Sequence, residues 1–526
     1  MKPKPLSLLK IFTYLFFSLL AVPADSLLAQ ISQPMRFEIQ KKANESYWNV
    51  VSAHEFGIAM FRENRRSDLG NKYWEVLMLD TDLNLKWEKE FPADRRNTFR
   101  GFDYSNNQLF LLFQEGSQDR GKYEIMRIQL ANGNIKNFSV EHQVPLELED
   151  FITVGESAVF GGYANGLPTV LMFNFAEDKF KVIPGLYRKN AYLLDLSADE
   201  VNNTFSIVIN ERYSQQENNL TIKTFNSSGD ILTDKQVSLD ENTNILSAKT
   251  TTFDWGEQVI TGTFGERNSD FAKGVYFVRI QDQQESALLQ YNFTELENYF
   301  NYLSGKQKER MDTRIEQLKA KGKELNVKSR IVLHELIPEG SEYIMLGEVY
   351  DVNFGTMNNS PYGTPYYMNN FNSGYRGYRV ALPNAQSIDR PATFEYKQAI
   401  IIGFSQTGEI KWDNSLVLNE LYVAYLNQMV HINTINNRSV LIYKDNSELI
   451  AIIFEKGGES SGTIEEIVKL KFEGDELRSE AKQFSGLSYW YEDNFFTWGY
   501  QRIRNKLDER APKSRNVFYI NKIKIR

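Results

Sequence analysis

A strand-turn-strand phrase recurs roughly every fifty residues along this chain of 526 residues. Its two clearest copies, residues 76–87 and 399–412, each contain an apolar run, a polar turn and then a segment with a tryptophan. Looser copies occupy residues 125–138, 170–182, 220–232, 275–288 and 468–477. Four strands of five or six residues, with their turns, fill about 50 residues, so this period is typical of an array of small sheets. We therefore predict an all-β fold, a single β-propeller of four-stranded blades.

The two ends of the chain are predicted to meet in one blade. Residues 517–526 form a strand, and residues 35–40 alternate between apolar and polar side chains. Pairing these segments would close the ring and remove two exposed strand edges. With this shared blade the propeller has eight blades and spans residues 30–526. Seven blades is the alternative, because the pattern after Tyr422 is ambiguous.

Two insertions are expected within the propeller. The first, residues 294–328, has helical character: Thr294 and Glu297 have the spacing of a capping box, and apolar side chains follow at helical intervals. We predict two short helices packed on the outside of a blade. The basic side chains of this region are interpreted as a solvated helix face.

The second insertion, residues 355–379, is rich in Tyr, Asn and Gly and lacks apolar periodicity, which predicts a loop. Bulky side chains that are partly polar, separated by Asn, Ser and Gly, resemble the composition of antibody binding loops. An ordered lid packed onto the propeller and a disordered spacer are the alternatives. The residues expected to contact a protein or glycan partner are Tyr362, Tyr366, Tyr367, Phe371, Tyr375 and Tyr378.

Residues 1–29 have the pattern of an export signal peptide. An apolar stretch over residues 11–22 follows three basic residues, Lys2, Lys4 and Lys10. Small residues come next, and cleavage is predicted after Ala24 or after Ala29. That stretch is short for a membrane span, which needs about 20 residues, so an uncleaved anchor is the alternative. Cysteine is absent, which favours a bacterial exported protein with a large core. We expect an exported location, periplasmic, cell-surface or secreted, and no transmembrane span.

Charge limits the classes of partner. The formal net charge is −8, and residues 1–29 carry three Lys and one Asp, which leaves a mature chain near −10. This acidity argues against general nucleic-acid binding, which needs clustered cations. The last residues differ, since nine Lys or Arg and two acids follow Gln501. Contact with an anionic surface and protection of a strand edge are both open for Arg502, Arg504, Lys506, Arg510, Lys513, Arg515, Lys522 and Lys524.

Motifs that suggest chemistry are incomplete. Residues 458–462 match G-x-S-x-G, but a nucleophile elbow needs a following helix and a later histidine, and the last one, His431, lies upstream. The acids after Asp80 suggest a calcium loop, yet Leu85 and Phe91 occupy the positions that need Gly and Glu. Both segments are interpreted as turns.

No catalytic, cofactor-binding or metal-binding residue is predicted. A zinc site would need four separate blades to bring together His54, His142, His334 and His431. The acidic residues Glu147, Glu149 and Asp150 are interpreted as ordinary surface charge.

The turn phrase resembles the blades of quinoprotein-like propellers with PQQ-type repeats, in which Trp follows four residues after a Gly-containing turn. Gly408 and Trp412 have this spacing, and Leu83 and Trp87 have it with Leu in place of Gly. The resemblance implies the fold alone, since such propellers include quinone-dependent dehydrogenases and outer-membrane assembly scaffolds. Our leading hypothesis is a non-catalytic binding or scaffolding protein of the cell envelope that needs no cofactor. The alternative is a propeller enzyme, either a glycan hydrolase or lyase or a quinone-dependent oxidoreductase.

Overall fold

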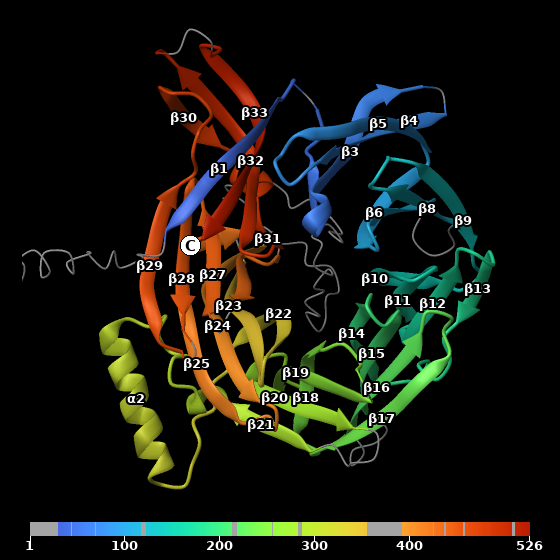
Figure 1. Cartoon of the computed structure of the whole chain (residues 1–526). Helices are drawn as coiled ribbons and strands as arrows, with labels where there is room; N and C mark the ends of the chain where they lie inside the picture. Colours follow the sequence, from blue (N-terminus) through green and yellow to red (C-terminus); the bar gives the residue numbers. More distant parts are fainter. Residues whose placement is uncertain are drawn as a thin grey trace, which may run out of the picture.

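The strands of this chain form eight antiparallel sheets placed as blades around one axis (Figure 1). The computed structural model describes residues 30–525 except 44, 69, 117–121, 213–217, 255, 282–286, 355–391, 424–425, 436–437, 456–457 and 508–510. The all-β propeller of eight blades predicted from the sequence is thereby confirmed, and the alternative of seven blades is wrong.

The first four blades take consecutive strands from the N-terminal half. Blade 1 contains β2 (Asn49–Ser52), β3 (Ile58–Ser67), β4 (Asn71–Leu79) and β5 (Leu85–Asp94), and blade 2 contains β6 (Asn97–Ser105), β7 (Gln108–Glu115), β8 (Lys122–Gln129) and β9 (Ile135–Glu141). Blade 3 contains β10 (Leu146–Val154), β11 (Ser157–Ala164), β12 (Leu167–Asn174) and β13 (Lys179–Val182), and blade 4 contains β14 (Ala191–Asp199), β15 (Thr204–Arg212), β16 (Asn218–Asn226) and β17 (Ile231–Leu239).

The next three blades follow the same order. Blade 5 contains β18 (Thr243–Thr250), β19 (Glu257–Glu266), β20 (Ala272–Gln281) and β21 (Leu288–Asn292), and blade 6 contains β22 (Arg330–Glu339), β23 (Glu342–Phe354), β24 (Ala392–Ser405) and β25 (Ile410–Val423). Blade 7 contains β26 (Val430–Ile435), β27 (Arg438–Asp445), β28 (Glu448–Phe454) and β29 (Ser460–Ile467). Apolar side chains pack between neighbouring blades, so each blade boundary has its own core.

Blade 8 combines both ends of the chain. The N-terminal strand β1 (Ile31–Gln40) pairs with β33 (Ser514–Ile525), which pairs with β32 (Asn494–Asn505). The predicted closure by the two chain ends is confirmed. It places β1 where an unpaired edge of β33 would otherwise face solvent.

Blade 8 also differs from the prediction, because it has five strands. The first part of β32 pairs with β31 (Gly486–Tyr491), and its second part pairs with β30 (Asp475–Glu480). Residues 468–477, interpreted above as another repeat, instead lead out of blade 7 into β30. The apolar pattern there was misleading because a strand of blade 8 has the same local signature as a blade hairpin.

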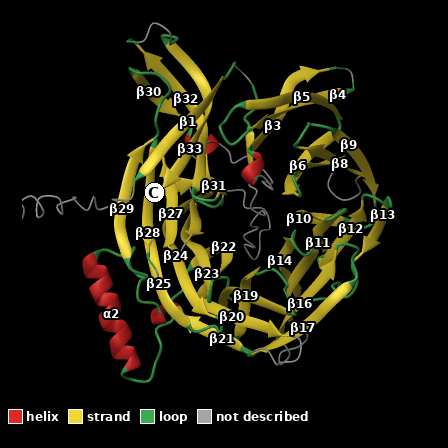
Figure 2. Cartoon of the chain, in the orientation of Figure 1, coloured by secondary structure: helices red, strands yellow, loops and turns green. Residues whose placement is uncertain are grey.

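The helical insertion contains one α-helix, α2 (Gly305–Lys319), on the outside of the ring (Figure 2). The prediction of two helices is wrong, because the first forms only a 3-10 turn, η2 (Phe293–Glu295), whose capping box uses Asn292 and Glu295. Tertiary contacts explain the difference: the backbone N–H groups of Glu297 and Asn298 donate to the Asp413 carboxylate of β25 over 2.9 and 2.7 Å. Two further 3-10 turns are η1 (His54–Phe56) and η3 (Lys482–Phe484). Among the described residues, none of these helices has the length and apolar character that a membrane span requires.

Candidate functional site

The strand closest to the axis of the ring is the first strand in blades 1 to 7 and β31 in blade 8. We call these strands, β2, β6, β10, β14, β18, β22, β26 and β31, the axial wall (Figure 1). Axial strands of neighbouring blades contact one another, for example β6 with β10 and β18 with β22. Side chains from distant parts of the sequence therefore meet on the axial wall, which makes it the candidate functional site.

Five successive axial strands carry a β-bulge at the same place. In blades 2 to 6 one residue of the first strand has no partner on the second strand, and these residues are Arg100, Glu149, Leu194, Leu246 and His334. A bulge bends its strand and turns a side chain to a new direction. The next residue carries a side-chain oxygen in four of these blades: Asp150, Asp195, Ser247 and Glu335. The bulges thus place polar groups at equivalent heights around the axis.

Blade 3 contributes the most acidic axial strand. Glu147, Glu149 and Asp150 all lie on β10, with Glu147 exposed and the other two partly exposed. Their exposure fits the interpretation as surface charge, and the structure adds that β10 lies at the axis rather than at the outer rim (Figure 1). Alternation alone did not reveal this, since an axial strand and a rim strand can both alternate.

Polar contacts join neighbouring blades along the axial wall. Between blades 4 and 5, the Lys249 ammonium lies 3.1 Å from the Asp195 carboxylate. Between blades 2 and 3, the Asp103 carboxylate accepts hydrogen bonds from the backbone N–H and the hydroxyl of Thr153 over 2.6 and 2.7 Å. These groups are engaged with the adjacent blade, so each contact fixes the relative position of two blades.

A second group of polar side chains joins blades 6 and 7. His334 Nε2 lies 2.6 Å from the Glu348 carboxylate, and neither side chain is exposed. The same carboxylate accepts the backbone N–H of Met429 over 3.0 Å and that of Val430. Glu348 therefore satisfies backbone donors at the entry to β26, which burial would otherwise leave unpaired.

Two neighbours of this pair are strongly affected by burial. Glu335 accepts a hydrogen bond from the Gln428 amide over 2.8 Å, and burial raises the pKa of its carboxyl group. Burial, with a smaller contribution from the nearby His334, lowers the pKa of His431 to about 3. A neutral imidazole and a carboxyl group with a raised pKa are consistent with a general acid or base as well as with a structural role.

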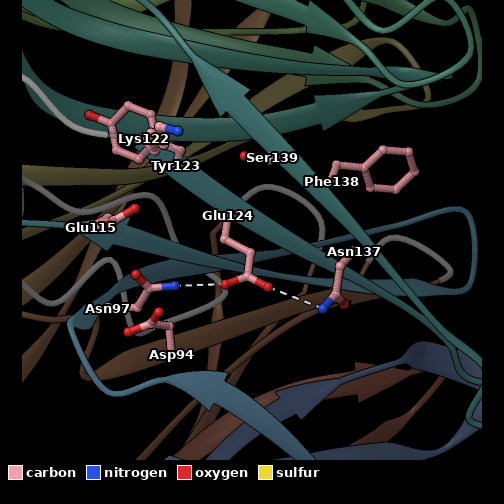
Figure 3. Close-up of a pocket in the computed structure, with 9 residues that line it drawn as sticks. All are labelled: Asp94, Asn97, Glu115, Lys122, Tyr123, Glu124, Asn137, Phe138 and Ser139. Carbon is pink, nitrogen blue, oxygen red and sulfur yellow. Dashed lines mark hydrogen bonds between the residues drawn. The ribbon is translucent and has the colours of Figure 1, made fainter. Parts of the chain in front are cut away.

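A separate recess lies at one end of blade 2 (Figure 3). It encloses about 300 Å³ and is lined by Asp94, Asn97, Glu115, Lys122, Tyr123, Glu124, Asn137, Phe138 and Ser139. Glu124 accepts hydrogen bonds from the amides of Asn97 and Asn137 over 2.6 and 3.1 Å, and burial raises its pKa. Within the described part of the chain, the Tyr123 hydroxyl and the Asn97 side-chain oxygen have no hydrogen-bond partner. The central carboxylate of this recess is thus engaged by two amides, and the two atoms without a partner are buried.

The comparisons with known proteins give no family. No protein-family model matches the sequence, and no curated protein matches it. Among solved structures, a prolyl endopeptidase has 8% identity and a TM-score of 0.37, over 88% of this chain and 54% of that chain. The β-propeller domain of the Trilobed protease from Pyrococcus furiosus has 8% identity and a TM-score of 0.31, over 78% and 93%. A polysaccharide lyase has 8% identity and a TM-score of 0.37, over 92% and 100%.

These likenesses carry no activity to this chain, because all three TM-scores are below 0.5. The chain also spans only about half the length of the prolyl endopeptidase, 54%.

The aromatic residues predicted to bind a partner lie outside the described residues. Their segment connects β23 to β24 of blade 6, and the role of Tyr362, Tyr366, Tyr367, Phe371, Tyr375 and Tyr378 stays a prediction.

The structure places both incomplete motifs in ordinary β-structure. Asp80 and Asn84 belong to the turn between β4 and β5. Ser460 begins strand β29, where a nucleophile elbow needs a helix. Within the described chain, no group of three His, Asp or Glu is arranged to hold a metal ion.

Proposed function

We propose that this chain is an exported, non-catalytic binding or scaffolding protein of the bacterial cell envelope. The observation that carries this proposal is the pairing of charged groups on and beside the axial wall. Asp195 with Lys249 joins blades 4 and 5. Glu348 contacts His334 within blade 6 and joins that blade to blade 7 through the backbone N–H groups of Met429 and Val430. A ring whose axial charges stabilise its own blade boundaries is suited to present loops rigidly rather than to perform chemistry at its centre.

The partner is proposed to be a protein or a glycan of the envelope, bound through the aromatic segment at residues 355–379. Support comes from the composition of that segment and from its position as a connection between two long strands of blade 6. A rigid blade on both sides limits the conformational entropy that binding must overcome.

The test is deletion of residues 355–379. The purified variant is expected to keep its melting temperature and to lose retention on glycan arrays or envelope protein fractions that retain the full chain. A matched variant with serine at the six aromatic positions should lose retention equally. A large fall in melting temperature would show that the segment belongs to the core, and unchanged retention would refute the proposal.

One observation favours an enzyme acting on glycans as a second candidate. Carboxyl groups follow the axial bulges in blades 3, 4 and 6, at Asp150, Asp195 and Glu335, and burial raises the pKa of Glu335. Glycoside cleavage needs two such groups on opposite sides of a sugar bond.

The two candidates are separated by incubating the protein with a panel of neutral and acidic polysaccharides. Turnover that disappears in Glu335→Gln and persists in Glu124→Gln, with both variants folded, would establish the enzyme. Lack of turnover on the whole panel, together with retention of a partner, would favour the binding protein.

A further inference from the structure

The C-terminal hairpin projects beyond the ring. Strands β32 and β33 each span 12 residues, and Figure 1 shows their outer ends, together with β30, extending past the other blades. The outer part of β32 pairs with β30, so this extension is a three-stranded sheet of its own. Because the extension projects past the other blades, it can contact a broad surface that the ring itself does not reach.

One face of this extension is cationic. Along β32, Arg502 and Arg504 are exposed, whereas Ile503 and Asn505 are buried, and the exposed Lys506 follows directly after the strand. Alternate residues of a strand share a face, so Arg502 and Arg504 point the same way, with Lys506 next to them at the end of the strand. The positions opposite Arg502 and Arg504 on β33 are the neutral Asn516 and Ser514. The acid opposite Arg504 on β30, Glu476, is paired with Arg478 over 2.7 Å.

The structure separates the basic residues of this end into two groups. Arg515 is buried in ion pairs with Glu38 and Asp475. Lys522 donates to the Tyr491 hydroxyl over 2.7 Å, and Lys524 lies 2.9 Å from Asp493. These three groups stabilise the fold, and Arg510 lies outside the described residues.

The second group has exposed charges. In the described part of the chain, no ion pair involves Arg502, Arg504, Lys506 or Lys513. We call Arg502, Arg504 and Lys506 the cationic hairpin face; Lys513 lies opposite Asn505 and is not part of it. The charge of this face is opposite in sign to the net charge of the chain, −8, so an anionic partner is attracted to this face in particular.

We propose that the cationic hairpin face docks this protein on the anionic lipid headgroups of a membrane surface. The side chain next to Lys506 supports lipid as the partner, because Leu507 is 77% exposed at the end of the hairpin. An exposed leucine among cations gains free energy by entering the headgroup boundary, and a soluble polyanion offers it no such environment. The proposal deepens the envelope function above by giving the element that holds the protein at a surface.

The test is co-sedimentation of the purified protein with vesicles of mixed phosphatidylglycerol and phosphatidylcholine, and with pure phosphatidylcholine vesicles. Binding to the mixed vesicles alone is expected. The triple variant Arg502→Gln, Arg504→Gln, Lys506→Gln should lower the partition coefficient by about 100-fold. Raising the ionic strength from about 0.1 M to about 1 M should have a similar effect, because the Debye length falls from about 10 to about 3 Å.

The control is a triple variant with the same change of charge on the exposed side of α2: Lys306→Gln, Arg310→Gln, Arg314→Gln. It should bind the mixed vesicles as the unchanged protein does. Leu507→Ser should weaken vesicle binding and leave binding to dextran sulfate unchanged.

Three results would overturn the proposal: equal losses in both triple variants, lack of binding to the mixed vesicles, or binding to dextran sulfate without binding to vesicles. The melting temperature of each variant shows that it is folded. Vesicle binding needs no protein or glycan partner. Its failure would therefore overturn the membrane proposal alone, and the deletion of residues 355–379 tests the proposed function separately.

Discussion

Lys444 of β27 and Glu480 of β30 form an ion pair across the boundary of blades 7 and 8, with side chains only 3% and 4% exposed. Glu480 also accepts hydrogen bonds from the Tyr519 hydroxyl over 2.9 Å and the Gln501 amide over 3.0 Å. Burial lowers the pKa of Lys444, which the partner carboxylate opposes. Removal of one partner would leave the other charge buried and uncompensated.

We expect Glu480→Gln to destabilise the protein by about 3–5 kcal/mol, the usual cost of breaking a buried pair on one side. Unfolding in denaturant measures the change. The double variant Glu480→Gln, Lys444→Met should recover part of the loss, because it removes both charges. A single variant as stable as the unchanged protein would show that water reaches the pair.

His431 predicts a pH dependence of stability. Its pKa is about 3 in the folded protein, where burial disfavours the charged form, and about 6.5 in an unfolded chain. Between these values the unfolded state binds the extra proton, so stability falls as the pH is lowered through 6.5. Because of this one group, the free energy of unfolding should fall by about 2 kcal/mol between pH 7 and pH 5.

The measurement compares denaturant unfolding at pH 7 and pH 5 for the unchanged protein and His431→Gln. The loss of stability on acidification should be smaller in the variant by about 2 kcal/mol. The comparison subtracts the contributions of all other ionisable groups, which both proteins contain. Equal losses in the two proteins would contradict the buried, neutral state of His431.

At the scale of elements, the turns between the third and fourth strands of several blades share one geometry. In the turns that start at Asp80, Asn226 and Ser405, the fourth residue donates its N–H to the carbonyl of the first, and its φ is positive. That residue is Leu83, Gly229 or Gly408, with φ of 60°, 78° and 90°. The recurring phrase in the sequence therefore reflects this turn, and its glycines serve a backbone conformation that other residues rarely adopt.

At one of these glycines, Gly408, close packing also leaves no room for a side chain. A Cβ atom on Gly408 would lie 2.4 Å from the ring of Phe277 and 2.8 Å from Leu289, both in blade 5. The turn of blade 6 is thus held against the preceding blade. Any side chain there would push the two blades apart.

Gly408→Ala is expected to lower the free energy of unfolding by about 2–4 kcal/mol, because the positive φ and the overpacking both disfavour a side chain. Gly462→Ala is the matched control, because Gly462 has a φ of 89° and a Cβ atom there would have no other atom within 4 Å. It should cost only about 1–2 kcal/mol. Thermal unfolding compares the two, and equal losses would show that the contact with Phe277 has no effect.

At the scale of the whole molecule, the ring depends on strand β1. Its Arg36 and Glu38 side chains pair over 2.7 Å, and Glu38 also lies 3.1 Å from Arg515 of β33. Arg515 in turn pairs with Asp475 of β30, whose pKa is about 2 although burial opposes this shift. A chain of buried ion pairs therefore links the first strand to strands near the other end of the sequence.

Removal of residues 30–40 should open the ring, expose the edge of β33 and lower the melting temperature, with aggregation as a further result. A synthetic peptide of residues 31–40 added in excess should restore the melting temperature, because it can pair with β33 from solution. A peptide with Glu38→Ala should restore it less. A truncated protein as stable as the full chain would refute closure by β1.

The sequence by itself determined the β-rich fold, the fifty-residue period, the shared turn and the pairing of the two chain ends. The first three features depend on short-range signals, such as alternation over a few residues or a glycine at a positive φ. The pairing of the chain ends follows from the need of a propeller to close its ring. Leu83 and Gly408 could be aligned as turn positions from the sequence because each is followed four residues later by a tryptophan.

Only the tertiary structure decided which polar residues face the axis and which cations stay free. Glu149 and His334 each precede an acidic residue, and two polar residues in succession break the alternation of the strand, as a bulge does. Their partners, however, lie on other strands or other blades, and no local pattern relates residues such as Asp195 and Lys249, which are 54 positions apart. Arg502 and Arg515 look alike in the sequence, and they differ because one faces solvent and the other faces Glu38 across a strand boundary.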